Sequence, residues 1–382
     1  MKITKIETLA LSRPHELERQ WVTARYRTIK ADCAIVVIHT DEGLTGIGEA
    51  SAYGWPLLIR EWVDFLAPEL IGQDPTDPSI VPHPSSLNRS HDAAVAGIDC
   101  ALWDLKGKIA GVPTARLLAE DPPMRIKLYA SSGCMYDWRK DPHQLIEEAL
   151  GYIEQGYKAM KFRVGTEWEW DGVTVDRYLG LVRELAEAVD GRMELMAEGN
   201  QRLTEEEAIR VAQEMSRIGG FGWLEEPIPA AQVDGYARIV AASDTPISGG
   251  ESKTTLGEFR PYLEKRAYDI VQPDAGLCGI TECLRIGKMA HRYDIDLVPH
   301  SWHNGLMAMA NAHMVAALPN PRYLELCLIQ GPLQWGIIAD PPKIEDGYLI
   351  LPDKPGLGVE LAEDLEEKFP YIEGHYAIQV QR

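Results

Sequence analysis

The pattern of apolar and polar positions divides the chain into two parts with different periods. Near the N-terminus, the alternating runs KITKIETLAL and CAIVVIHTDEG with LTGIGEAS predict antiparallel strands joined at an Asp-Glu-Gly turn. WPLLIREWVDFLAPELIG and HDAAVAGIDCALWDLKGKIAG place apolar residues three and four apart, as helices do, and the second segment ends at Gly111 before Pro113. We therefore predict an α+β domain over residues 1–125.

From residue 126 the pattern becomes a regular alternation of strand-like and helix-like segments. The strand-like runs are IKLYAS, AMKFRVG, MELMAEG, GWLEEP, PISGG, AYDIVQPD, IDLVPH and RYLELC. Eight such runs with helices between them predict a parallel α/β barrel over residues 126–345, whose site lies on the loop face that follows the strands. The turn-rich tail, residues 346–382, is expected to pack back on the first domain.

Three acidic residues end successive strand-like runs at a nearly constant interval. Glu198 lies in ELMAEGN, Glu225 follows 27 residues later in GWLEEP, and Glu251 follows after another 26 residues in PISGGES. In a parallel barrel the carboxyl ends of the strands meet at one mouth, so these three carboxylates are expected to face a shared volume. The alternative is that they are solvated strand-end residues that cap helices and form salt bridges.

A cluster of three carboxylates needs a cation. Ligation by oxygen alone, without Cys or His at these positions, suits a hard ion, and Mg²⁺ typically binds a few carboxylates together with water and substrate. The spacing therefore predicts a Mg²⁺ site formed by Glu198, Glu225 and Glu251.

The interval continues beyond these three residues. Asp274 in VQPD, His300 in LVPH and Glu325 in RYLEL follow at distances of 23, 26 and 25 residues, and each ends a strand-like run. An Asp that fixes the tautomer of a neighbouring His makes that His a general base, so we predict an Asp274–His300 dyad. Taken alone, His300 can be a structural histidine beside Pro299, and Asp274 can be the N-cap of the next helix.

The second strand of the predicted barrel has two cations on one face. Lys161 and Arg163 in KAMKFRVG are two residues apart and are therefore expected to point into the barrel. Buried cations need anions, and the acidic ring and a carboxylate substrate would supply them. Together these groups predict removal of the proton alpha to a carboxylate, with metal and cations stabilising the enediolate.

The order and spacing of these motifs resemble the enolase superfamily, and within it the mandelate racemase subgroup (mandelate racemase/muconate lactonizing enzyme family) of acid-sugar dehydratases and racemases. The resemblance covers almost the whole chain and rests on TDEGLTGIGEAS, AVAGIDCALWDLKGK, KAMKFRVG, AEGNQ, WLEEP, GGES, VQPDAGLCGI, VPHSW and LPDKPGLGVEL. It implies a modified TIM barrel, (β/α)7β, with an N-terminal α+β capping domain that the C-terminal segment completes.

The resemblance also implies a role for each site residue. Glu198, Glu225 and Glu251 would be the metal ligands, with Glu226 outside the ligand set. His300 and Asp274 would form the catalytic dyad. Lys161 would be the electrophilic lysine, and Glu325 would hydrogen-bond a carboxylate oxygen of the substrate.

Arg163 departs from the family pattern, because related racemases typically have a second lysine there as a base. Arginine stays protonated at ordinary pH, so one-base chemistry by His300 is favoured and the reaction is expected to be dehydration of a sugar acid to a 2-keto-3-deoxy acid. Two alternatives stay open. One is a racemase or epimerase that uses Arg163 as a second base, and the other is a non-catalytic barrel that binds sugar acids.

Other polar and aromatic residues are candidates for substrate binding. The segment SRPHELERQWVTARYRT is too long for a hairpin turn, which suggests a functional loop whose arginines serve either a substrate or solubility. Asn200 and His303 are expected near the barrel mouth, where they contact substrate hydroxyls or support the catalytic residues. The predicted substrate-binding residues are Arg19, Arg25, Tyr26, Asn200, Trp55 and His303.

Composition narrows the class of partner. The chain has 382 residues, long enough for two structural units, and its formal charge is −20. This charge, without a basic run, argues against binding nucleic acid or an anionic membrane, so a small carboxylate is expected as the partner. The six cysteines form no CxxC pair and are expected to be reduced core residues. We further expect a cytoplasmic protein that forms a homo-oligomer.

Overall fold

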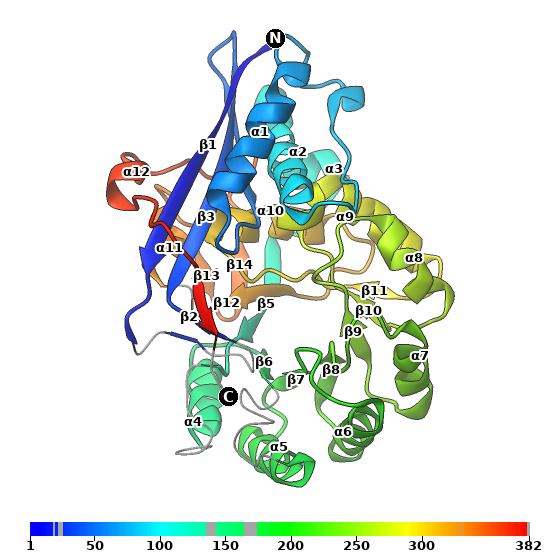
Figure 1. Ribbon diagram of the computed structural model, residues 1–382. Coiled ribbons are helices and arrows are strands. Elements are labelled where there is room, and N and C mark those ends of the chain that lie inside the picture. The colour runs from blue at the N-terminus through cyan, green and yellow to red at the C-terminus, as the bar shows by residue number, and fades with distance from the viewer. Residues whose placement is uncertain (18–19, 22–25, 135–142, 164–173, 330, 380–382) are drawn as a thin grey trace.

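The computed structural model describes residues 1–382 except 18–19, 22–25, 135–142, 164–173, 330 and 380–382. The N-terminal unit contains a three-stranded antiparallel sheet in the order β1-β3-β4, covered by helices (Figure 1). Its elements are β1 (Ile3–Pro14), β3 (Lys30–Thr40), β4 (Thr45–Ala50), α1 (Pro56–Leu70), the 3-10 turn η2 (Pro78–Ile80), α2 (Arg89–Ala110) and α3 (Thr114–Leu118). The short strand β2 (Tyr26–Thr28) lies outside this sheet.

The local predictions for this unit are confirmed. β3 and β4 pair antiparallel on either side of the Asp-Glu-Gly turn. Both predicted helices form, and α2 ends at Gly111, whose φ of 69° is a left-handed conformation that glycine adopts without a steric penalty.

The second unit is a barrel of eight parallel strands, and all eight lie on the predicted runs. Their ladder runs β12-β5-β6-β7-β8-β9-β10-β11. The strands are β5 (Arg125–Ser131), β6 (Ala159–Arg163), β7 (Glu194–Glu198), β8 (Phe221–Glu225), β9 (Ile247–Gly249), β10 (Ile270–Val271), β11 (Asp296–Leu297) and β12 (Leu324–Cys327).

A helix follows each of the first seven strands. These helices are α4 (Gln144–Glu154), α5 (Val175–Val189), α6 (Glu205–Ile218), α7 (Val233–Ala242), α8 (Leu256–Glu264), α9 (Ala275–His291) and α10 (Gly305–Ala316). The fold is therefore a (β/α)7β barrel with an α+β capping domain, as predicted. Beneath the mouth, the barrel interior is closed by a buried cluster that includes Tyr129, Trp223 and Tyr323.

The C-terminal segment contacts both units. Its elements are α11 (Pro332–Gly336), β13 (Ile344–Glu345), β14 (Tyr348–Ile350), α12 (Leu365–Lys368) and β15 (Ala377–Gln379). β14 pairs antiparallel with β5 of the barrel, whereas β15 pairs with β2 next to the capping domain (Figure 1). The boundaries at residues 125 and 345 stay predictions.

Two further sequence predictions concern cysteine and membrane spans. All six cysteines are free and buried, which confirms that they are reduced core residues. Among the described residues, no helix combines the length and the apolar character that crossing a membrane requires.

Candidate active site

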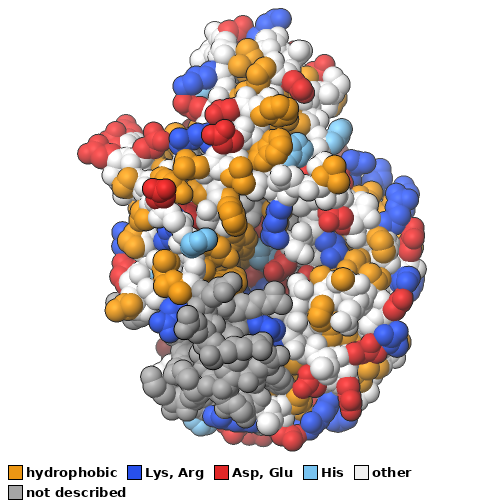
Figure 2. Space-filling model, viewed as in Figure 1, with side chains coloured by type: hydrophobic (Ala, Val, Ile, Leu, Met, Phe, Trp, Pro, Cys, Tyr) orange, Lys and Arg blue, Asp and Glu red, His pale blue; other side chains and the backbone are white. Residues whose placement is uncertain are grey.

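The structure brings Glu198, Glu225 and Glu251 together at the carboxyl end of the barrel. Glu198 and Glu225 are the last residues of β7 and β8, and Glu251 follows β9 by two residues. One oxygen from each carboxylate lies within 4.8 Å of the others. Glu198 and Glu225 are buried, whereas Glu251 keeps part of its surface open to solvent. Figure 2 shows acidic side chains in the hollow between the two units on this face.

Lys161 of β6 supplies a positive charge beside this cluster. Its Nζ lies 2.5 Å from Glu225 Oε1, 2.9 Å from Glu325 Oε1 and 3.5 Å from Glu198 Oε2. Burial opposes the charge on Lys161, but Glu225 and Glu325 outweigh it and raise the pKa of the lysine well above its usual value. Lys161 is therefore held as an ammonium group among three carboxylates.

The donor set fits a divalent cation. Burial and the neighbouring Glu225 raise the pKa of Glu198. Lys161 is one cation among three carboxylates, so a further positive charge would be favourable here. The three convergent groups are all carboxylates, which hard cations such as Mg²⁺ prefer to nitrogen or sulfur ligands. Glu198, Glu225 and Glu251 are the residues that would hold such an ion.

The loops that follow these strands are held in sparsely populated backbone conformations. Asn200 and Glu226 have positive φ values of 45° and 33°. A Cβ on Gly199 would lie 2.6 Å from Pro227 Cα, so only glycine allows these two loops to approach so closely. Strained backbone of this kind is typical of functional sites, where surrounding contacts hold it in place.

Glu226 ties these loops together from outside the three-carboxylate cluster. Its carboxylate accepts hydrogen bonds from Gly250 N at 3.1 Å and Gln201 Nε2 at 2.6 Å. Burial raises its pKa to about 7. Glu226 therefore connects the loops after β7, β8 and β9, and sequence reasoning did not find this role because it depends on contacts between loops.

On the opposite side of the mouth, His300 and Asp274 form a hydrogen-bonded pair. His300 Nδ1 lies 2.7 Å from Asp274 Oδ2, and His300 Nε2 lies 3.5 Å from Glu251 Oε2. Burial opposes protonation of His300, but Glu251 and Asp274 raise its pKa to about 9. The Nε2 atom thus faces the carboxylate cluster, and Asp274 orients the ring.

Asp274 has two structural roles at once. Its Oδ1 accepts hydrogen bonds from Gly276 N at 2.9 Å and Asn311 Nδ2 at 3.1 Å, so it is the N-cap of α9 as well as the partner of His300. The N-cap interpretation and the dyad were alternatives in the sequence, but the two oxygens of the carboxylate satisfy both.

Glu325 lies between the two sides of the mouth. Its Oε1 accepts a hydrogen bond from Ser131 Oγ at 2.6 Å and pairs with Lys161, while Oε2 accepts from Ser301 N at 2.7 Å. Although burial opposes its ionisation, Lys161 and His300 lower its pKa. Glu325 is therefore a buried anion in contact with the loop that begins at His300.

Arg163 does not join the carboxylate cluster directly. Its Nη1 donates to Asn200 Oδ1 at 2.6 Å, and its guanidinium lies 4.6 Å from the ring centre of Trp302 and 5.7 Å from that of Trp21. Burial opposes its charge, but Cys134 and Glu198 raise its pKa above the ordinary arginine value. Asn200, predicted to bind substrate, is thus a hydrogen-bond partner of Arg163.

His303 and Tyr53 join the capping domain to the barrel mouth. His303 Nε2 lies 2.9 Å from Ser51 Oγ, and its ring centre is 4.3 Å from that of Tyr53. Burial lowers the pKa of His303 to about 3, so the ring is neutral. Its ring centre is 6.4 Å from that of His300. His303 therefore lies next to the dyad.

The remaining predicted substrate-binding residues are placed differently. Trp55 is 56% exposed and lines a surface cavity beside Tyr53. Tyr26 packs edge-on against Trp21 and Tyr376, the latter contributed by the C-terminal segment. Arg19 and Arg25 lie outside the described residues.

Glu49 of β4 is a buried residue that connects the capping domain to the start of α10, and it was not identified from the sequence. Its carboxylate accepts hydrogen bonds from Asn304 Nδ2 at 2.8 Å and Met307 N at 2.9 Å, at the start of α10. Carboxylate oxygens are favourable acceptors at a helix N-terminus, and here the capping domain supplies them, although burial raises the pKa of Glu49 to about 7. The only sequence signal was a charged residue at the end of an apolar strand.

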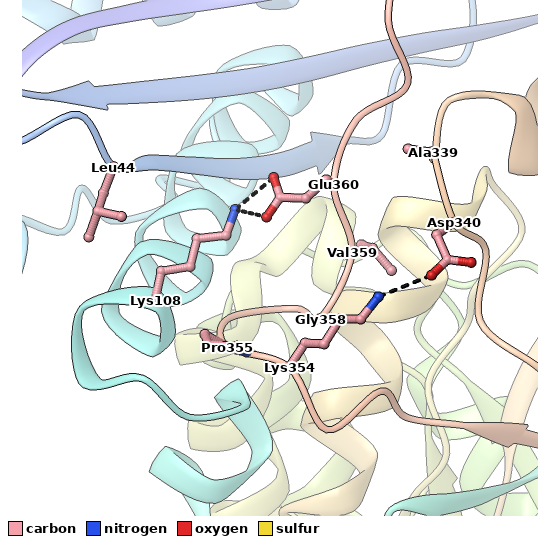
Figure 3. A pocket seen from close by; sticks show the side chains of 9 residues that line it. All are labelled: Leu44, Lys108, Ala339, Asp340, Lys354, Pro355, Gly358, Val359 and Glu360. Atoms are coloured by element: carbon pink, nitrogen blue, oxygen red, sulfur yellow. Dashed lines mark hydrogen bonds and ion pairs between the residues drawn. The ribbon is translucent and has the colours of Figure 1, made fainter.

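A second cavity lies away from the barrel mouth, and the charged residues that line it form ion pairs with one another. It measures about 350 Å³ between the capping domain and the C-terminal segment (Figure 3). Its lysines are paired: Lys108 contacts Glu360 at 3.1 Å, and Lys354 contacts Asp340 at 3.0 Å. Figure 3 shows each lysine pointing toward the carboxylate with which it pairs, so the positive charges of the two lysines are already neutralised.

Comparison with known proteins agrees with this architecture. Residues 5–119 match the mandelate racemase/muconate lactonizing enzyme N-terminal domain, and residues 144–365 match the enolase C-terminal domain-like family. The chain belongs to the mandelate racemase/muconate lactonizing enzyme family. Enzymes of the enolase superfamily use a divalent metal, which agrees with the carboxylate cluster.

Relatives in this family act on sugar acids. The chain is 29% identical to arabinonate dehydratase from Saccharolobus solfataricus over 87% of this chain and 89% of the relative. It is 31% identical to L-talarate/galactarate dehydratase from Salmonella typhimurium over 90% and 84%. The crystal structure of 3,6-anhydro-D-galactonate cycloisomerase from Zobellia galactanivorans is 31% identical, with a TM-score of 0.83 over 97% of this chain and 99% of that one.

Proposed function

We propose that this protein is a Mg²⁺-dependent dehydratase that converts a sugar acid to a 2-keto-3-deoxy acid. The observation that carries the proposal is the arrangement of His300 Nε2, oriented by Asp274 and directed toward Glu251 of the carboxylate cluster. A base beside a metal site is what removal of a proton alpha to a carboxylate requires. Dehydratases among the relatives support the same reaction class.

The carbon acid must be stabilised as its proton leaves. A bound Mg²⁺ would supply Lewis acidity to the substrate carboxylate. Lys161, kept charged by Glu225 and Glu325, would hydrogen-bond an oxygen on which charge develops. Glu325, a buried anion, would hold Lys161 and the loop that begins at His300 in place beside that carboxylate.

His300 would carry the proton through both halves of the reaction. Its Nε2 takes the proton from C2, and the C2–H electrons become the enediolate. The enediolate expels the hydroxyl group from C3, which takes the proton from His300 and leaves as water. The resulting enol becomes the 2-keto-3-deoxy acid when C3 gains a proton. One residue serves as base and then as acid, so no second base is needed.

Arg163 supports dehydration over racemisation. Inversion at C2 needs proton donors and acceptors on both faces, but the guanidinium on the β6 side is stacked on Trp302 and its pKa is raised further. Arg163 therefore contributes positive charge and holds Asn200.

The test is a panel of aldonic, aldaric and uronic acids incubated with the protein and Mg²⁺. We expect 2-keto-3-deoxy acid to form from at least one acid, to disappear when EDTA removes the metal, and to contain deuterium at C3 when the reaction is run in D₂O. Formation of the C2 epimer without loss of water would show a racemase, and binding without any exchange at C2 would show a non-catalytic barrel.

A further inference from the structure

A cavity of about 420 Å³ opens on the capping domain. Its lining includes Ser51, Tyr53 and Trp55 from the end of β4 and the turn that follows, together with Arg89 at the start of α2. None of these four residues belongs to the carboxylate cluster or to the dyad.

Two residues that line this cavity, Ser51 and Tyr53, contact His303. Ser51 hydrogen-bonds His303, Tyr53 packs against His303, and the ring of His303 is next to that of His300. Tyr53 also has a positive φ of 29°, an uncommon conformation for an aromatic residue. Tyr376 packs 6.1 Å from Tyr53, and its ring would lie 2.6 Å from a Cβ on Gly54, so the C-terminal segment braces this side of the cavity.

Arg89 is the charged group of the cavity. It is exposed, and among the described residues it makes no hydrogen bond or ion pair. The pKa of His303 is lowered mainly by burial, and the positive charge of Arg89 lowers it further. Arg89 therefore shares the cavity with Ser51 and Tyr53, the two residues that contact His303, and its guanidinium donors stay available.

Helix stability does not explain an arginine at this position. Arg89 is the first residue of α2, a helix of 22 residues, where the helix dipole disfavours a cation. Such a local conflict without a compensating contact points to a function. A guanidinium binds a carboxylate with two parallel hydrogen bonds, which a hydroxyl group does not match.

We propose that this cavity receives the far end of the substrate and that Arg89 binds a second, terminal carboxylate there. The proposal rests on the proposed function, which places the reacting carboxylate at the cluster of Glu198, Glu225 and Glu251. The preferred substrate class is then a dicarboxylic sugar acid, with Ser51 and Tyr53 facing its hydroxyl-bearing middle. A monocarboxylic sugar acid presents only a hydroxyl group to Arg89.

The test compares matched acids that differ only at the far end, such as galactarate with galactonate and glucarate with gluconate. For the wild-type protein with Mg²⁺, we expect kcat/KM to be higher for the dicarboxylic member of the accepted pair. Arg89→Gln should lower kcat/KM for that acid by about tenfold, since one exposed charge-assisted interaction is lost. It should leave the monocarboxylic acid within about threefold.

Two variants serve as controls. Arg89→Lys keeps the charge and should retain part of the preference, whereas Arg116→Gln removes an exposed arginine of α3 that pairs with Asp353, away from the cavity, and should change neither acid. Equal loss for both members of a pair in Arg89→Gln, or no loss for either, would overturn the proposal.

Failure of the proposed function is a separate result. If no acid in the panel is turned over, titration calorimetry of galactarate and galactonate against the Mg²⁺-loaded protein replaces the kinetic assay. Tighter binding of the dicarboxylic acid that Arg89→Gln abolishes would support the inference without dehydration, and equal binding of the two acids would refute it.

Discussion

The two sides of the barrel mouth contain similar numbers of charged residues but differ in what those residues can do. On the β10 and β11 side, Asp274 orients a histidine whose Nε2 faces Glu251 of the carboxylate cluster. On the β6 side, Lys161 is held charged by carboxylates and Arg163 is stacked on Trp302. In the proposed reaction, one side would exchange protons and the other would stabilise charge, which is the division of roles that one-base dehydration needs.

Removing the base should have the largest effect. Because His300 is the proposed base that takes the proton from C2, His300→Asn is expected to lower kcat by at least about 10³-fold. Its imidazole is outside the carboxylate cluster, so Mg²⁺ affinity measured by titration calorimetry should be unchanged. Near-normal turnover in this variant would contradict the assignment of the two sides.

Removing the fixed charge on the other side should be nearly as severe. Lys161→Met leaves Glu225 and Glu325 without their cation, and the lost stabilisation of the enediolate should lower kcat by about 10²- to 10³-fold. Thermal unfolding should show a lower Tm as well, because breaking a buried ion pair costs about 3–5 kcal/mol. A variant with normal kcat would show that Lys161 only stabilises the fold.

The metal cluster between the two sides can be tested with adjacent glutamates. Glu225→Gln removes one ligand charge and should weaken Mg²⁺ binding by at least about tenfold. The matched variant Glu226→Gln leaves the ligand set intact and should have a smaller effect, since Glu226 holds only the loops. Unchanged affinity in Glu225→Gln, measured by calorimetry, would remove this residue from the ligand set.

The smallest effect on dehydration is expected from a substitution of Arg163, which tests whether the β6 side can exchange protons. Arg163→Lys gives the β6 side a group that loses its proton more readily than arginine does. The variant also loses the contact between the guanidinium and the ring of Trp302, so the rate of dehydration should fall, but by less than about tenfold. In D₂O, we expect the C2 epimer to appear in recovered substrate for this variant. Formation of that epimer by the wild-type protein would instead show that Arg163 already acts as a base.

The sequence alone determined the barrel and the composition of its mouth. Strand and helix periods differ clearly, so the eight strands could be found without a structure. Because parallel strands end at one face, residues that end successive strands were expected to converge. Glu198, Glu225 and Glu251 do so in the structure, and His300 and Asp274 lie in direct contact.

The tertiary structure alone decided what surrounds these residues. Glu49 holds the start of α10, the ring of Trp302 lies against Arg163, and Arg89 lines a cavity with Ser51 and Tyr53. Each of these arrangements brings together segments that are far apart in the chain. Periodicity records which face of an element is buried, but not which other element covers it. The reaction class therefore follows from local pattern, whereas the fit to a particular acid depends on how the capping domain lies against the barrel.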